Sequence, residues 1–293
     1  MPSLKQITTK IKSVKGTRRI MSAMKLIAAV KLQRAQSLLK AYRPYSDAYK
    51  NVVFNVAGKL EAEDHPLLRR STEKNSLHII FLTSDRGLCG SFNSTLIRNV
   101  KNYLDSEAKN FSNINISFIG RRGKEYFSDS DYDVYKYYTG VNEKNYSSTS
   151  KELAASLTEE FKEGKADEIV IAYNYFQSVL SQVMTFEKIL PLEFEDTEND
   201  KDSSDYIFEP KKEEIVDSIL PKYIQIRIER AINESMTSEH ASRMTAMENA
   251  TSNADEVIKK LTLLFNKTRQ AIITTELMDI VNGTEAQKKG GNN

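Results

Sequence analysis

The stretch FLTSDRGLCGSFN, residues 81–93, carries the residues of this chain that most suggest chemistry. An apolar run ends there at a polar turn and gives way to a helical pattern, and such a strand-to-helix turn can bind a phosphate through its backbone N–H groups. The turn lacks the Lys and the length of a Walker loop, and its two glycines do not have the spacing of a dinucleotide fingerprint. We therefore predict that Asp85, Arg86, Gly87 and Gly90 form a structural turn, and phosphate binding stays open as the alternative.

Other reactive side chains are sparse. The single cysteine, Cys89, has no flanking His or Asp, so we interpret it as a small buried residue and not as a nucleophile. His65, His78 and His240 are scattered and have no ligand spacing for zinc or iron. We find no constellation of nucleophile, base and orienting acid, and we expect no cofactor, no metal and no catalysis by this chain.

Composition and charge point to a helical protein with a basic end. The 293 residues include only 11 Gly and 6 Pro, which favours long regular elements, and no apolar stretch approaches the length of a membrane helix. The first 50 residues carry twelve Lys and Arg against one acid, Asp47, whereas residues 193–214 are strongly acidic and predict a solvated loop. A basic helix could bind DNA or RNA, but the chain has neither aromatic platforms nor a recognition motif, so we expect no nucleic acid.

Two long helices are expected at the ends of the chain. From Ser3 to about Leu60 the apolar residues keep a seven-residue repeat, which Arg18, Lys25 and Ser46 interrupt. The repeat consists of Leu4, Ile7, Ile11, Val14, Met21, Ala28, Leu32, Ala35, Leu39, Tyr42, Tyr49, Val53 and Val56. A second apolar stripe runs from about residue 212 to 281. No ordinary globular domain needs a helix of about 80 Å, so we predict that the two helices pair as an antiparallel coiled coil.

The middle of the chain has a different period. Four β-rich runs, at 77–85, 115–120, 168–176 and 179–192, lie among helical patterns at 94–109 and 150–164. This alternation predicts a small α/β domain. We therefore expect an N-terminal helix at 1–60, an α/β domain at 61–210 and a C-terminal helix at 211–293.

Several long motifs resemble one family, the gamma subunit of the F-type ATP synthase. They are RRIMSAMKLIAAVKLQRAQ at 18–36, TSDRGLCGSFN at 83–93, SEHASRMTAMENATSNADEVI at 238–258 and NKTRQAIITTELMDIVNG at 266–283. Their order and spacing agree with the family nearly from end to end. The chain departs from it in ending on TEAQKKGGNN instead of a small apolar tail, and in lacking the cysteine-bearing insert of chloroplast members.

The resemblance implies a fold in which a Rossmann-like α/β domain is inserted between the two helices of the coiled coil. It implies a non-catalytic central rotor that couples ion flow to ATP synthesis and regulates both ATPase activity and ion flow. Its implied partners are the alpha and beta subunits of the catalytic ring, the epsilon subunit and the c ring. We expect a peripheral protein on the cytoplasmic side of a bacterial inner membrane, because the basic start at Ser3 belongs to the rotor motif and is not a transit peptide.

The resemblance also assigns contact residues. Met24 and Lys25 match the rod segment that faces the acidic loop of beta, although Met24 could equally be seam packing, and Lys25 could serve a polar network. Arg243 and Glu276 match a polar set across the rod. Three further residues match the upper contact of rotor with stator: Arg269, Gln270 and Thr274.

Overall fold

The structure is a computed structural model, and it describes residues 3–57, 65–69, 75–128, 132–193 and 212–290. The chain divides into two compact units. We call Met1–Ile27 with Ala246–Asn293 the helical unit, and Ala28–Thr245 the α/β unit. Two long helices, α1 (Leu4–Ala57) and α5 (Lys212–Gly290), contribute residues to both units.

The two helices pair antiparallel in the helical unit. Arg18 Nε lies 2.6 Å from Asp255 Oδ1, and Lys25 Nζ lies 2.7 Å from Glu248 Oε1, so the residue number rises along α1 as it falls along α5. Ile7 of α1, with 3% of its surface exposed, is buried in this unit. The same antiparallel order holds in the α/β unit, and the predicted coiled-coil pairing is confirmed within each unit.

A five-stranded sheet forms the centre of the α/β unit, in the order β3-β2-β1-β4-β5. The strands are β1 (Ser76–Leu82), β2 (Asn113–Ile119), β3 (Asp133–Tyr138), β4 (Glu168–Phe176) and β5 (Gln182–Leu190). The first four are mutually parallel, and β5 runs antiparallel to β4. In the register of the central strands, Ile79 of β1 lies opposite Ile116 of β2 and Val170 of β4.

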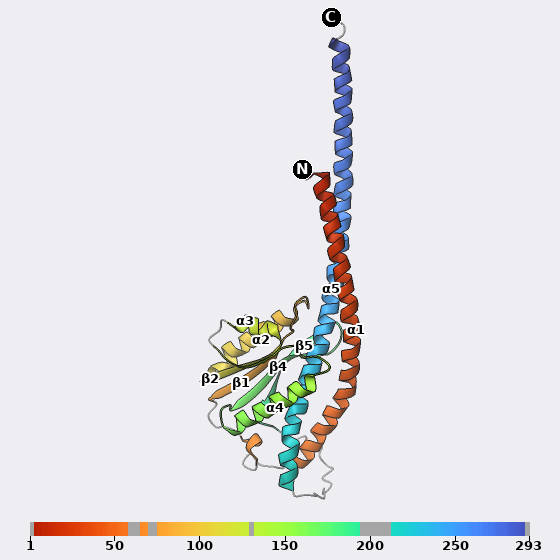
Figure 1. Ribbon diagram of the computed structural model, residues 1–293. Helices are drawn as coiled ribbons and strands as arrows, with labels where there is room; N and C mark the ends of the chain where they lie inside the picture. Colours follow the sequence, from red (N-terminus) through yellow and green to blue (C-terminus); the bar gives the residue numbers. More distant parts are fainter. Residues whose placement is uncertain (1–2, 58–64, 70–74, 129–131, 194–211, 291–293) are drawn as a thin grey trace. The chain divides into compact units, whose positions relative to one another are not determined.

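Helices cover both faces of this sheet (Figure 1). One face packs on α2 (Phe92–Ser106) and α3 (Arg121–Phe127), and the other on α4 (Tyr146–Lys162) and on the parts of α1 and α5 within this unit. Residues of β1 alternate between the two cores: Phe81 faces α2 and α3, whereas Ile80 and Leu82 face the other helices. A strand buried on both faces explains why β1 is an almost continuous apolar run.

The predicted fold class is confirmed: a mixed α/β domain with a mainly parallel sheet lies between long N- and C-terminal helices. Sequence reasoning missed β3 and α3. The sequence of β3, DVYKYY, has exposed Val134, Tyr135 and Tyr137 at the sheet edge and therefore lacks the apolar signature of the buried strands. The division at 1–60, 61–210 and 211–293 stays a prediction, and most of the acidic segment 193–214 lies outside the described residues.

Candidate functional site

The turn after β1 is held by side chains from several elements. The carboxylate of Asp85 accepts a hydrogen bond from the backbone N–H of Arg121 at 3.0 Å and another from Gly140 at 2.7 Å. Gly90 has a φ of 60°, in the left-handed region. Leu88 has the same conformation at 64°, which a residue with a side chain rarely adopts. Asp85 thus joins the end of β1 to the start of α3 and to the loop after β3.

The carbonyl groups of this turn bind α5. Ser242 Oγ donates to the carbonyl oxygen of Cys89 at 2.7 Å, and Arg243 Nη2 donates to the carbonyl oxygens of Arg86 at 3.0 Å and Gly87 at 3.4 Å. The carbonyl oxygens of the turn thus fix its position against α5, which is a structural role, whereas a phosphate would be bound by backbone N–H groups. These contacts favour the structural interpretation of the turn over phosphate binding.

Cys89 is buried, with 2% of its surface exposed, as predicted. Its Sγ accepts a hydrogen bond from Asn93 Nδ2 at 3.2 Å. A thiol enclosed in this way is a packing residue of the turn and has no access to a substrate.

The polar cavity at the carboxyl ends of the parallel strands is small. Thr83, Gly120, Ser235 and Glu239 are among its lining residues, and its volume is about 40 Å³. Sheets of this class bind nucleotides at this edge, and ligand pockets usually have roughly 300–1,000 Å³. The cavity therefore has no room for a nucleotide.

Three side chains form a constellation that sequence reasoning failed to find. His78 Nε2 lies 2.8 Å from Ser117 Oγ, and His78 Nδ1 lies 2.7 Å from Glu160 Oε2, which is the order of a nucleophile, a base and an orienting acid. The statement that no such set exists was therefore wrong. Ser117 and His78 are both fully buried, at 0% exposure, so no substrate can reach the hydroxyl.

Parallel pairing explains how the constellation forms. His78 of β1 and Ser117 of β2 lie on neighbouring strands, and Glu160 comes from the helix that covers that face. A His within an otherwise apolar strand is the one weak signal of this set in the sequence. Because a buried imidazole must be hydrogen-bonded, we interpret the set as a satisfied polar element of the core.

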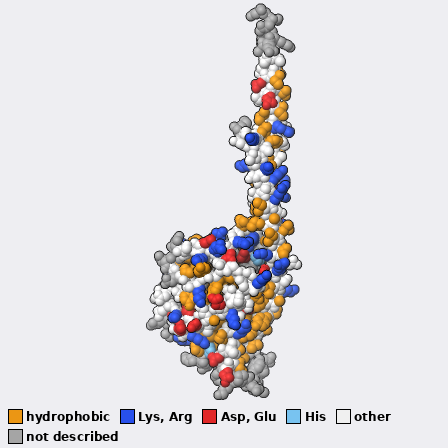
Figure 2. Space-filling model, in the orientation of Figure 1, with side chains coloured by type: hydrophobic (Ala, Val, Ile, Leu, Met, Phe, Trp, Pro, Cys, Tyr) orange, Lys and Arg blue, Asp and Glu red, His pale blue; other side chains and the backbone are white. Residues whose placement is uncertain are grey.

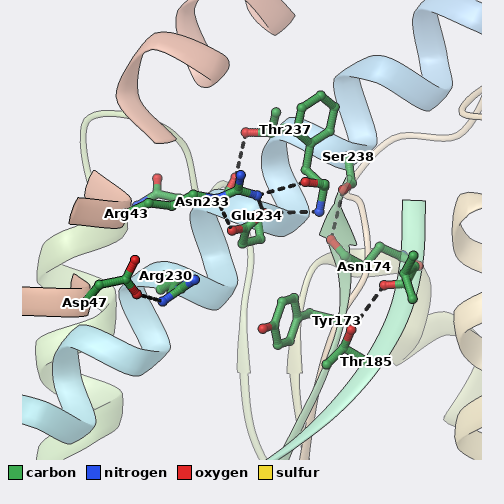
Figure 3. A network of polar contacts seen from close by, with 12 residues as sticks. Arg43, Asp47, Tyr173, Asn174, Thr185, Arg230, Asn233, Glu234, Thr237 and Ser238 are labelled. Carbon is green, nitrogen blue, oxygen red and sulfur yellow. Dashed lines mark hydrogen bonds and ion pairs between the residues drawn. The ribbon is translucent and has the colours of Figure 1, made fainter. Parts of the chain in front are cut away.

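A second polar network joins three elements around Arg43 of α1, Glu234 of α5 and the end of β4 (Figure 3). Arg43 donates through Nε and Nη2 to the two carboxylate oxygens of Glu234, each at 2.7 Å. Arg43 Nη2 also donates to the carbonyl oxygen of Phe176 at 2.8 Å, and the N–H of Phe176 donates to Glu234 at 3.1 Å. Sequence reasoning counted Arg43 only among the basic residues of the N-terminal helix.

Met24 and Lys25, the predicted contact residues of α1, belong to the helical unit. Met24 is half-buried, and Lys25 pairs with Glu248, which gives this lysine a place in a polar pair between the helices. Both side chains of that pair remain substantially exposed, at 36% and 56%. Their contact with another subunit stays a prediction.

The other predicted contact residues lie along α5. Arg269, Gln270, Thr274 and Glu276 are all exposed in the helical unit, and Thr274 Oγ1 donates to the carbonyl oxygen of Gln270 at 2.9 Å. Arg243 belongs to the α/β unit, where its described partners are Glu239 and the turn after β1. That Arg243 and Glu276 act as one set stays a prediction.

The last part of α5 in the helical unit exposes many apolar side chains (Figure 2). Those with 38–70% of their surface exposed are Leu263, Leu264, Ile272, Ile273, Leu277, Met278, Ile280 and Val281. Because successive residues of an α-helix are about 100° apart, this set surrounds the helix instead of forming one stripe. A helix that is apolar on all sides is usually enclosed by protein or lipid.

Comparisons with known proteins decide the family. The pattern of the ATP synthase family matches residues 3–287, and the ATP synthase gamma chain of Trichlorobacter lovleyi is 42% identical over 289 residues, which cover 98% of this chain and 100% of the relative. The chain belongs to the ATP synthase gamma chain family.

Solved structures agree with the gamma chain assignment. A chain of the Tetrahymena thermophila mitochondrial ATP synthase, described as central stalk and c ring, is 25% identical with a TM-score of 0.61, over 79% of this chain and 99% of that one. A chain of the Euglena gracilis mitochondrial ATP synthase, in a structure of OSCP, F1 and c ring, shares the fold. It is 20% identical with a TM-score of 0.65, over 99% of this chain and 96% of that one.

The described ranges of this gamma chain contain neither a metal cluster nor a membrane-crossing helix. Within the described ranges, no three residues among His, Cys, Asp and Glu are grouped so that they could hold a metal ion. None of the helices in those ranges combines the length and apolar character that a bilayer crossing requires.

Proposed function

We propose that this gamma chain is the central rotor stalk of an F-type ATP synthase and couples ion flow to ATP synthesis. The observation that carries the proposal is its match to gamma chains along nearly the whole of both sequences. The chain is thus a stalk subunit and not a catalytic one, and it regulates ATPase activity and ion flow through the positions it adopts.

The exposed end of α5 supports a place inside the catalytic ring. When protein covers these apolar side chains, the free energy falls by about 25 cal/mol per Å² of apolar surface removed from water. A ring of alternating alpha and beta subunits would cover them on every side. Arg269, Gln270, Thr274 and Glu276, exposed among these apolar residues, are then the contacts with the stator.

The mechanism is a shift of populations. Each beta subunit has open and closed states, and a rotor can favour one of them only by contacting the two states differently at each angle. Met24 and Lys25 would contribute to this difference from α1. The polar contacts are weak and exposed, so they can be exchanged at each step.

We assign the remaining partners to the α/β unit, which would contact the epsilon subunit and the c ring. The chain would then be a peripheral protein on the cytoplasmic side of a bacterial inner membrane. The solved relatives come from a structure of a central stalk with a c ring and from one of F1 with a c ring, which supports this assignment.

Native mass spectrometry of the tagged chain, isolated gently from its own cells, tests the proposal. We expect one copy in a large complex with several nucleotide-binding subunits. A free chain, or one that carries nucleic acid, would contradict the proposal. ATP hydrolysis by the purified chain alone, at the rate of a complete motor, would contradict it as well.

A further inference from the structure

We propose that Arg43, Glu234 and the backbone of Phe176 form a joint that fixes the orientation of α1 and α5 against the sheet, and that ion pumping depends on this joint. The inference rests on the proposed rotor function and names positioning residues for it. Torque that enters the α/β unit acts on the two helices through their contacts with the rest of that unit, and this joint is the contact that bonds both helices to the sheet at one point.

The joint is a closed cycle of hydrogen bonds. The fork of Arg43 binds both oxygens of Glu234, while the N–H and the carbonyl group of Phe176 bind Glu234 and Arg43 respectively. Each of the three elements therefore bonds to the two others. A displacement of α1 or α5 along the end of β4 must break at least one charge-assisted hydrogen bond.

The surroundings strengthen this cycle. The side chain of Glu234 is 0% exposed and that of Arg43 is 31% exposed, so water competes weakly for the carboxylate. The guanidinium carbon of Arg43 also lies 4.9 Å from the centre of the Tyr175 ring, within the range of a cation–π contact. The pKa of Arg43 is raised, first through its hydrogen bond to Glu234, so the guanidinium of Arg43 stays charged.

Apolar packing cannot replace the joint. α1 and α5 share a large apolar core with the sheet, and Leu32 and Leu39 of α1 pack with Phe176 and Ala241 in a smaller apolar cluster of the same unit. The hydrophobic effect has no direction, so such a cluster resists separation more than it resists sliding. Hydrogen bonds have a preferred angle and distance, and they fix the register of the contact.

A second ion pair supplies a matched control. Arg230 Nη1 of α5 lies 2.6 Å from Asp47 Oδ1 of α1, so this pair joins the same two helices, but its bond does not include the sheet (Figure 3). Asp47 is 58% exposed, and the pair should contribute little to stability. Loss of this pair therefore tests whether breaking any ion pair between α1 and α5 is sufficient to lower ion pumping.

The experiment uses membranes from cells in which the chromosomal copy of this chain is deleted and a plasmid supplies it. ATP hydrolysis is measured together with the ATP-driven membrane potential, which a dye reports whichever cation is pumped. For Arg43→Lys and Glu234→Gln we expect normal assembly. The initial rate at which the membrane potential forms, divided by the rate of ATP hydrolysis, should fall by about fivefold, which is at the low end of typical coupling factors. Asp47→Asn should leave the ratio unchanged.

Arg43→Lys keeps the charge but loses the fork, so it decides the question if Glu234→Gln fails to assemble. A merely structural defect lowers hydrolysis and pumping together and leaves their ratio unchanged, which would overturn the joint. An equal fall of the ratio in Asp47→Asn would also overturn it. If the wild-type chain itself does not restore pumping to the deleted membranes, the proposed function fails, and not only the joint.

Discussion

His78 Nδ1 lies 2.7 Å from Glu160 Oε2 in the interior of the α/β unit, where both side chains are at most 1% exposed. A carboxylate in such a place must have hydrogen-bond partners, because an unsatisfied buried group costs about 1–3 kcal/mol or more. Glu160 receives a second hydrogen bond from Asn115 Nδ2 at 3.3 Å. The contact therefore contributes to the stability of the core.

We expect His78→Ala to lower the free energy of unfolding by about 3 kcal/mol or more, because it leaves a cavity and removes a partner from Glu160 and from Ser117. Ser117→Ala should cost only about 1–2 kcal/mol, since it removes one hydroxyl from the set. Urea unfolding of the purified chain measures both changes. Ester hydrolysis by the wild-type chain that Ser117→Ala abolishes would show instead that the constellation is catalytic.

Partial burial of His240 predicts a dependence of stability on pH. Desolvation lowers the pKa of His240 to about 4, with smaller contributions from the charges of Arg243 and Lys31, and no hydrogen-bond partner of Nδ1 is found among the described residues. The unfolded chain binds a proton near the ordinary pKa of about 6.5, before the folded chain does. The free energy of unfolding should therefore fall as pH drops from about 6.5 toward 4.

His240→Gln tests this dependence, since it removes the titrating group and keeps a polar side chain of similar size. Urea unfolding at pH 7.5 and pH 5 should show a smaller loss of stability for the variant than for the wild-type chain, by about 1–2 kcal/mol. Burial raises the pKa of Glu239, which contributes in the opposite direction. Because both proteins contain Glu239, its contribution cancels in the comparison. The same loss in both proteins would exclude His240 as the cause.

The pair of Lys25 and Glu248 should add little to stability, although it interrupts the apolar seam. Exposed ion pairs contribute about 0.2–1 kcal/mol, and salt weakens them. We therefore expect a double-mutant cycle with Lys25→Met and Glu248→Gln to give a coupling energy below about 1 kcal/mol. A value of several kcal/mol would mean that this pair holds the two helices of the helical unit together.

The periodicity of the sequence predicted the long helices well, because a helix that is buried along one side repeats its apolar residues at regular intervals. Ile7, Leu32 and Val53 are buried as the heptad pattern requires. The pattern fails at Ile272, which belongs to the apolar stripe but is 38% exposed. The sequence pattern identifies an apolar face, and it does not identify which partner covers that face.

Polar contacts between distant residues could not be predicted in this way. Arg43 and Glu234 are 191 positions apart, and the constellation of His78 depends on the order of strands in the sheet. The turn at Asp85–Gly90 was identified from its glycines, but its binding to Ser242 and Arg243 required the structure. Local propensity describes elements, whereas these contacts depend on how the elements pack.

Charge reversal at Glu276 tests the proposed contact with the stator. Glu276 is exposed, so Glu276→Lys should leave folding and assembly largely intact. A new positive charge would bind one angular state of the ring too tightly, and we expect ATP synthesis to fall more than ATP hydrolysis. Both rates are measured on the same membranes. Equal loss of both rates with failed assembly would indicate misfolding.

The exposed apolar residues at the end of α5 should matter for assembly of the complex and not for folding of the isolated chain. Ile273 and Leu277, exposed at 47% and 57%, contribute little to folding of the free chain, so Ile273→Gln with Leu277→Gln should change its free energy of unfolding by less than about 1 kcal/mol. Light scattering should show less self-association of the purified variant, because an exposed apolar patch has been reduced. If a ring covers these residues, the same variant should lose binding to the alpha and beta subunits in reconstitution. Undiminished binding would place this part of α5 outside the ring.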